Sequence, residues 1–151
     1  MTIRPAQPSD RDFVLALADR LVSFDVPAWR SKDELVEGDR RALAEWFNHP
    51  KTDEAMFIAE LAGQPAGCAF LVTLVDYFSS RPHAHLSVLA VAEAAEGRGV
   101  GSALIDRSTE WARERRSDRL TLSALVTNAR ARALYERRGF GGEYVRYVLP
   151  L

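Results

Sequence analysis

The chain has 151 residues and a formal net charge of −1, with 47% hydrophobic and 27% charged side chains. That length predicts one domain, residues 1–151, and the composition suffices for a packed core. No apolar run reaches the roughly 18 residues needed to span a bilayer, and the N-terminus lacks the apolar stretch of a secretion signal. A single cysteine, Cys68, cannot form an internal disulfide, which favours a reducing cytoplasm over a secreted disulfide scaffold.

The charge is unevenly distributed along the chain. Residues 98–138 carry ten arginines against five acids, whereas residues 1–97 carry nine bases against fifteen acids. Two interpretations are open: ordinary charged helix surfaces, or a polyanionic ligand near the second half and a cationic ligand near the first. Nucleic acid is a weaker candidate, because the chain as a whole is not basic.

Hydrophobic periodicity and turn signals predict an order of strands and helices. Ser31 and Glu34 form a capping box, and Asn128 is placed to cap a short helix that ends at Gly139. This order predicts a mixed sheet with helices on both sides. The expected elements are a strand at 2–5, a helix from Ser9 to about Phe24 with Asp12 completing its cap, a helix from Ser31 to about Phe47, strands at 55–61, 66–75 and 83–92, a helix at 99–115, a strand at 120–125, a helix from Asn128 to Gly139 and a closing strand at 143–149.

The sharpest local signal is a glycine-rich loop that follows a strand and opens a helix. It reads Glu96-Gly97-Arg98-Gly99-Val100-Gly101-Ser102. Glycines let the backbone approach a ligand, and the unpaired N–H groups and the dipole of the following helix favour an anion such as phosphate. The loop fits neither the dinucleotide motif G-x-G-x-x-G nor a Walker loop, which requires a lysine. A tight turn that binds no ligand is the alternative.

Two stretches together resemble the GCN5-related N-acetyltransferase (GNAT) family. Gly99 and Gly101 match the small positions of the family signature [Q/R]-x-x-G-x-[G/A], which binds the pyrophosphate of acetyl-CoA. The stretch from Asn128 to Phe140 resembles the family pattern N-x-x-A-x-x-[L/F]-Y-x-x-x-G-F. Glu96 departs from the signature, because a carboxylate repels phosphate. We expect its side chain to turn away and leave the main-chain amides to bind.

The resemblance implies an α/β (α+β) GNAT fold: a mixed, mostly antiparallel sheet of six to seven strands, with helices on both faces and a splayed pair of fourth and fifth strands. It implies an enzyme that moves an acetyl group directly from acetyl-CoA to a primary amine of a small molecule or peptide. The single cysteine adds the expectation that this enzyme is cytoplasmic. No nucleic-acid or membrane partner is expected. Because members of the family often pair as dimers, a homodimer is a further expectation.

The resemblance also assigns the acetyl-CoA site residue by residue. Tyr135 matches the family's tyrosine acid, and a phenol with a pKa of about 10 is protonated at pH 7 and can donate to a departing thiolate. Leu89 matches the strand position whose main-chain N–H binds the oxyanion. The expected cofactor-binding residues are Leu89, Val91, Gly97, Arg98, Gly99, Val100, Gly101, Ser102, Asn128 and Tyr135.

The general base has a weaker signal. Residues 83–91 contain no carboxylate, although many family members carry one on this strand. His85 lies fourteen residues before Gly99, which matches the catalytic glutamate of the family's histone acetyltransferases. A histidine with a pKa of about 6.5 is partly neutral at pH 7 and can accept a proton. The alternative for His85 is a hydrogen-bonded strand histidine.

No metal site is expected. His83 and His85 share one face of their strand, but His49 and Cys68 do not stand at ligand spacing to complete a set of three or four ligands. Cys68 is expected to pack as a small apolar residue.

The residues expected to bind the acceptor amine have the least specific signal in the sequence. In the family the first two helices and the loop after the third strand shape the acceptor pocket, and aromatic residues with acids suit a cationic amine. The alternative for the aromatic residues is that they cover the core. The alternative function is a non-catalytic acyl-CoA-binding regulatory module. The candidate acceptor residues are Phe24, Asp25, Trp29, Asp76, Tyr77 and Phe78.

Overall fold

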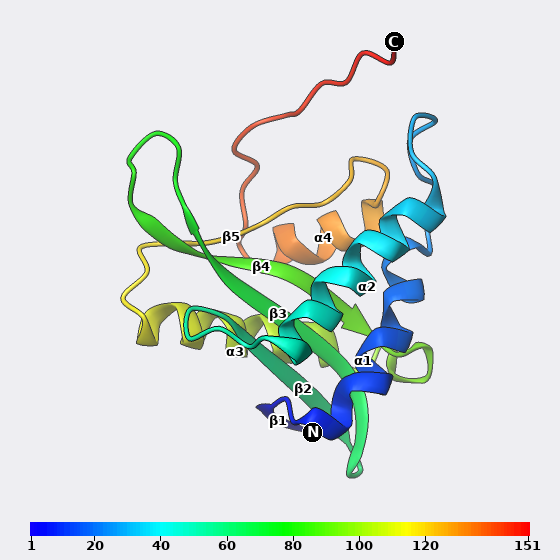
Figure 1. Ribbon diagram of the computed structural model, residues 1–151, viewed down its shortest axis with the longest axis vertical. Coiled ribbons are helices and arrows are strands. Elements are labelled where there is room, and N and C mark those ends of the chain that lie inside the picture. The colour runs from blue at the N-terminus through cyan, green and yellow to red at the C-terminus, as the bar shows by residue number, and fades with distance from the viewer.

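The sheet of the protein is a mixed sheet of five strands in the computed structural model, which describes residues 1–151 (Figure 1). Its order is β1-β2-β3-β4-β5; the first four strands pair antiparallel, and β5 runs parallel to β4. The strands are β1 (Thr2–Pro5), β2 (Ala55–Leu61), β3 (Gln64–Val75), β4 (Pro82–Val91) and β5 (Leu120–Leu122).

Helices cover both faces of this sheet, as the sequence predicted. Figure 1 shows α1 and α2 over one face and α3 over the other, with α4 beside the end of β4. The α-helices are α1 (Arg11–Ala16), α2 (Lys32–Asn48), α3 (Val100–Glu114) and α4 (Ala129–Arg137), and the 3₁₀ turns are η1 (Pro8–Asp10), η2 (Leu17–Val22) and η3 (Glu93–Ala95).

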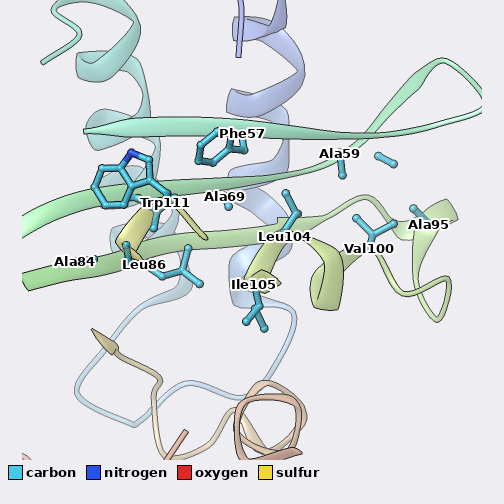
Figure 2. Close-up of a cluster of buried hydrophobic side chains, with 13 residues drawn as sticks. Phe57, Ala59, Ala69, Ala84, Leu86, Ala95, Val100, Leu104, Ile105 and Trp111 are labelled. Carbon is cyan, nitrogen blue, oxygen red and sulfur yellow. The ribbon is translucent and has the colours of Figure 1, made fainter. Parts of the chain in front are cut away.

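Strand alternation divides the core into two layers. Phe57 and Ala59 of β2 face α3, where Leu104 and Trp111 pack against the sheet (Figure 2). Met56 and Ile58, which alternate with them along β2, face α1 and α2 and pack with buried apolar side chains of those helices. Because successive strand residues point to opposite faces, a strand that is apolar throughout is covered on both sides.

Ser87 is an extra residue that changes the face of β4. Leu71 pairs with Leu86 and Phe70 pairs with Val88, so Ser87 has no partner on β3. Leu86 consequently packs in the α3 layer, whereas Val88 packs in the α1 and α2 layer, although both are even-numbered. This β-bulge has no counterpart among the sequence expectations, because two-residue alternation carries no marker for one inserted residue.

β4 and β5 stay paired for only a short distance. Their register joins Ala84–Leu86 to Leu120–Leu122 and then stops. The expected strand at 120–125 therefore ends at Leu122, and the part of β4 from Ser87 to Val91 has no partner strand on that side. This separation agrees with the splayed pair expected from the resemblance.

The expectation of six to seven strands is wrong, because the sheet has five. Residues 143–149 form no strand; this tail extends away from the sheet (Figure 1), with Tyr144 and Tyr147 exposed. An alternating sequence shows how a strand would present its side chains. A strand also needs a neighbouring strand with free N–H and C=O groups, and alternation does not provide one. The neighbouring edge strand, β5, is only three residues long.

The first helical segment also differs from its expectation. It is divided into η1, α1 and η2 instead of forming one helix capped by Ser9 and Asp12. The Gln7 amide donates to Asp10 Oδ2 over 2.7 Å, and Arg4 donates to both oxygens of the same carboxylate. These bonds hold the pKa of Asp10 below its usual range. The expected box at α2 is present in part, since the Glu34 amide donates to Ser31 Oγ over 3.1 Å.

Candidate active site

A cleft of about 590 Å³ opens where β4 and β5 separate. Residues Leu86–Val91 of β4 line its centre, and η2 and α2 line one side. Residues Ser123–Leu125 and α4 line the other side, and the glycine loop with the first turn of α3 completes the lining. Its volume lies in the range of small-molecule binding sites.

The main chain at the start of α3 supplies free hydrogen-bond donors to this cleft. Gly99 is the N-cap residue at φ +79°, and no side chain caps the helix. The amides of Val100, Gly101 and Ser102 make no hydrogen bond within the protein, while Ala103 is the first residue of the turn to donate, to Gly99. Because α3 has no acidic residue in its first turn, these donors and the helix dipole fit a phosphate group.

The positive φ angle of Gly99 explains why glycine stands at the helix entrance. An L-amino acid with a side chain is disfavoured in this left-handed region, whereas glycine enters it freely. Gly101 has a different role: a Cβ built there would lie 3.4 Å from Leu134 Cδ2 and 3.8 Å from Val91 Cγ2. The first turn of α3 is thus packed closely between β4 and α4.

Glu96 is neutralised by two arginines from different parts of the chain. Its Oε1 accepts a hydrogen bond of 2.6 Å from Arg20 of η2, and its Oε2 accepts one of 2.9 Å from Arg130 of α4. Hydrogen bonds from Arg130 first, and from Arg20, lower the pKa of Glu96. The side chain therefore does not leave the cleft, which it lines; its charge is compensated in place.

Tyr135 of α4 lines the same cleft as the free amides. Its ring packs edge-on against Phe140 with 6.0 Å between centroids, and its hydroxyl makes no hydrogen bond within the protein. Burial raises the pKa of the phenol, because the charged phenolate is poorly solvated there. The hydroxyl is therefore protonated at neutral pH and available as a donor.

The free side of β4 presents main-chain groups to the cleft. Leu89 and Val91 line it and lie beyond the last residue paired with β5. An unpartnered strand edge offers N–H and C=O groups to an extended ligand, much as it would to another strand. Asn128 lines the cleft as well, and its Oδ1 accepts a 3.1 Å hydrogen bond from the Ala131 amide, which confirms the expected cap of α4.

The structure thus brings together nine of the ten expected cofactor-binding residues. Arg98 is the exception: its side chain is exposed and does not line the cleft. Arg98 lies at the outer side of the loop, between Gly97 and Gly99 at φ +72° and +79°.

His85 lies outside the lining of the cleft. Its Nδ1 and Thr121 Oγ1 are 2.8 Å apart, and the Thr121 hydroxyl is 3.4 Å from the carbonyl of Ala84. If Thr121 donates to that carbonyl, it accepts from His85 Nδ1–H and leaves Nε2 with the free lone pair. Burial, and second the neighbouring His83, lower the pKa of His85.

Of the six candidate acceptor residues, only Phe24 lines the cleft. Asp25 and Trp29 are exposed in the loop after η2. Tyr77 and Phe78 lie at the tip between β3 and β4 and are 90% and 84% exposed. Asp76 accepts hydrogen bonds from the amides of Phe78 and Ser79, so its carboxylate organises that tip.

Sequence reasoning missed four charged residues that line the cleft: Arg20, Asp39, Arg130 and Arg137. Arg20 and Asp39 lie in helical stretches that look like ordinary solvated surface in the sequence. The two other arginines fall within the Asn128–Phe140 stretch, where the arginine-rich composition was the available signal. A smaller hollow of about 260 Å³ lies on the α2 side, and Ser87 lines both spaces.

Two further observations concern metals and membranes. Nowhere in the protein do three His, Cys, Asp or Glu side chains gather in a way that could hold a metal ion. None of its helices combines the length and apolar character needed to cross a bilayer. Cys68 is buried, and burial raises its pKa to about 12, as expected for an inert thiol in the core.

Known structures share this architecture. A putative acetyl transferase from Pyrococcus furiosus superposes with a TM-score of 0.75 at 23% identity, covering 99% of each chain. An aminoglycoside 6'-N-acetyltransferase from Acinetobacter haemolyticus superposes with a TM-score of 0.71 at 21% identity, covering 100% of this chain and 99% of the other. At these identities the likeness shows a shared fold.

Sequence comparison adds a family assignment. An uncharacterized N-acetyltransferase, YhfO of Bacillus subtilis, is 27% identical over 99% of this chain and 97% of its own length. A mycothiol acetyltransferase of Beutenbergia cavernae is 53% identical over 65 residues, which are 42% of this chain and only 22% of that protein. The model of the acetyltransferase (GNAT) family matches residues 18–140, which include most of η2, the glycine loop and α4. The chain therefore belongs to the acetyltransferase (GNAT) family.

Proposed function

We propose that the protein is an acetyl-CoA-dependent N-acetyltransferase that transfers the acetyl group directly to a primary amine of a small molecule or peptide. The observation that carries this proposal is a single cleft lined by three free amides at the start of α3 and by the Tyr135 phenol. The first feature suits a diphosphate and the second suits a departing thiolate.

When bound, acetyl-CoA supplies an activated thioester. The amides of Val100, Gly101 and Ser102 would hold its phosphates, and the free edge of β4 at Leu89 and Val91 would orient its extended arm. The Leu89 main-chain N–H is the expected donor to the carbonyl oxygen, and Asn128 lies beside this path. Tyr135 would give its proton to the sulfur as the thiol leaves.

His85 is proposed as the base that removes the amine proton. Its position between β4 and β5, outside the cleft lining, requires a water molecule to carry the proton. Its lowered pKa keeps the imidazole neutral at pH 7, which is the form that accepts a proton.

A panel of amines incubated with acetyl-CoA and the purified protein tests this function. The panel contains an aminoglycoside, because one structural neighbour bears that name, and also a polyamine, an arylalkylamine and a lysine peptide. We expect at least one amine to raise the release of free thiol well above the rate without acceptor, with the acetylated amine detected by mass spectrometry.

The second candidate, a non-catalytic acyl-CoA-binding module, is favoured by one observation. Glu96 places a carboxylate at the position where the resembled signature has a glutamine or arginine. Calorimetric binding of coenzyme A without thiol release for any amine would support this candidate. Such a result would reject the acetyltransferase proposal.

A further inference from the structure

Two carboxylates line the cleft, and they differ in their surroundings. Glu96 is hydrogen-bonded to Arg20 and Arg130 at 2.6 and 2.9 Å. Asp39 of α2, by contrast, makes no side-chain hydrogen bond or ion pair within the protein, although it is half-buried. The cleft therefore contains one acid with its charge satisfied and one without a partner.

Asp39 lies on the side of the cleft opposite Tyr135. It follows Leu35 by one helical turn, and these two residues are the part of α2 that lines the cleft. Leu35 packs against the buried residues Ala18 and Val22 of η2, so this face of α2 is held against the fold. A residue at helical spacing from a packed one is well positioned to present its side chain in a fixed place.

The neighbouring cations are already engaged with other acids. Arg40, the next residue on α2, lies 3.1 Å from Asp19 and 3.7 Å from Glu37. Arg20, which also lines the cleft, lies 2.6 Å from Glu96 and 3.6 Å from Glu93. None of these groups compensates the Asp39 charge.

The fold gains nothing evident from this unpartnered charge. Removing a carboxylate from water without a counter-ion is unfavourable, and burial accordingly raises the pKa of Asp39. Sites that cost stability without a structural return are often functional. The missing component at this position is a positive charge, which a ligand can bring.

We propose that Asp39 is a specificity-determining residue that binds the cationic ammonium group of the acceptor amine. This inference rests on the proposed acetyltransferase function and names the acceptor class: an alkylammonium carried on an apolar or aromatic stem. Phe24 and Leu35, which line the same side of the cleft, supply the apolar surface for such a stem. An acceptor whose carboxylate lies close to its amine is disfavoured, because the uncompensated charge of Asp39 repels it.

Calorimetry with a matched pair of probes tests this assignment. The probes are 2-phenylethylamine and phenylalanine, which differ by one carboxylate, and each is titrated into the full-length protein saturated with coenzyme A. We expect 2-phenylethylamine to bind the wild-type protein more tightly than phenylalanine. Asp39→Asn should weaken its binding about tenfold or more, the range for losing a hydrogen-bonded charge pair.

Two further variants control this experiment. Asp39→Glu keeps the charge and should retain most of the affinity. Asp33→Asn removes an exposed acid from the first turn of the same helix, away from the cleft, and should leave affinity unchanged. Thermal unfolding confirms that each variant is folded; Asp39→Asn should be at least as stable as the wild type, because it removes an unpaired charge.

The possible results separate this inference from the proposed function. Equal binding of 2-phenylethylamine by the wild type and Asp39→Asn, or no binding by the wild type, overturns the role of Asp39. Asp39-dependent binding without thiol release from acetyl-CoA overturns the acetyltransferase function alone. Where thiol release is seen, the inference further requires Asp39→Asn to raise the KM for the amine while the KM for acetyl-CoA stays constant.

Discussion

The two sides of the cleft are built by different means. On the side of α3, the functional groups are main-chain amides at Val100, Gly101 and Ser102, and their direction is fixed by the helix itself. On the side of η2 and α2, the functional groups are side chains, among them Phe24 and Asp39. A main-chain site tolerates many side chains, whereas a side-chain site changes with each substitution. We infer that the first side holds the common donor and the second selects the acceptor.

Tyr135→Phe should have the largest effect, because it removes a proton donor without removing the ring. We expect turnover to fall by about 10²- to 10⁴-fold, with little change in the KM for acetyl-CoA. Steady-state kinetics at a saturating acceptor concentration measure this effect. Tyr144→Phe, in the exposed tail, is the matched control. Full turnover by Tyr135→Phe would show that the thiolate leaves without this phenol.

Gly99→Ala tests the main-chain side of the cleft. A Cβ at this position meets no atom within 4 Å, so the substitution acts through its φ of +79°. The strain of about 1–2 kcal/mol should distort the helix entrance and raise the KM for acetyl-CoA about fivefold or more. Gly142→Ala, also free of contacts but without a positive φ, should have no effect. An unchanged KM for Gly99→Ala would mean that this conformation is not needed for phosphate binding.

Glu96→Gln should have a smaller effect on the KM for acetyl-CoA, and it should lower this KM where Gly99→Ala raises it. Removing this charge releases Arg20 and Arg130, and it also removes the one carboxylate beside the free amides. We expect the KM for acetyl-CoA to fall about threefold, since a partly exposed charge interaction contributes about 1 kcal/mol or less. Glu93→Gln is the control, because Glu93 contacts the same arginine but is 82% exposed. A higher KM for Glu96→Gln would instead show that Glu96 positions the two arginines for binding.

His85→Gln should mainly change a pH profile. A base whose pKa is lowered from 6.5 is neutral above that value, so kcat/KM should decline only as the pH falls below 6.5. The substitution should remove this acidic limb and lower activity at pH 7. His49→Gln, an exposed histidine at the end of α2, should leave the profile as it is. If His85→Gln shows the same decline of kcat/KM below pH 6.5, that decline belongs to another titrating group.

The features of the site that could be predicted from the sequence are those that depend on local patterns. The glycine loop, the Asn128 cap and Tyr135 were identified because each depends on a local pattern: a left-handed φ, a helix end or a fixed offset along one helix. The place of Asp39 in the cleft and the ion pairs of Glu96 were not identified, because both depend on how η2, α2 and α4 are brought together by the fold. Local spacing carries no information about such contacts.

The strands show a similar limit. Residues 55–61 form a strand as predicted, since both neighbours of β2 are available for pairing. Residues 143–149 alternate in the sequence but remain unpaired, because a strand also requires a neighbouring strand to pair with. The bulge at Ser87 could not be predicted for a different reason. The residues on both sides of it are apolar, so the change of face does not alter the order of apolar and polar residues along β4.

That bulge decides which face each later residue of β4 occupies. If Ser87 took part in regular pairing with β3, strict alternation would carry Leu89 and Val91 to the layer of α1 and α2, and Val88 and Ala90 to that of α3. The cleft would then be lined by a different set of side chains, although the amino-acid sequence was the same. One unpaired residue thus acts as a spacer that keeps the outer half of β4 in phase with its neighbour.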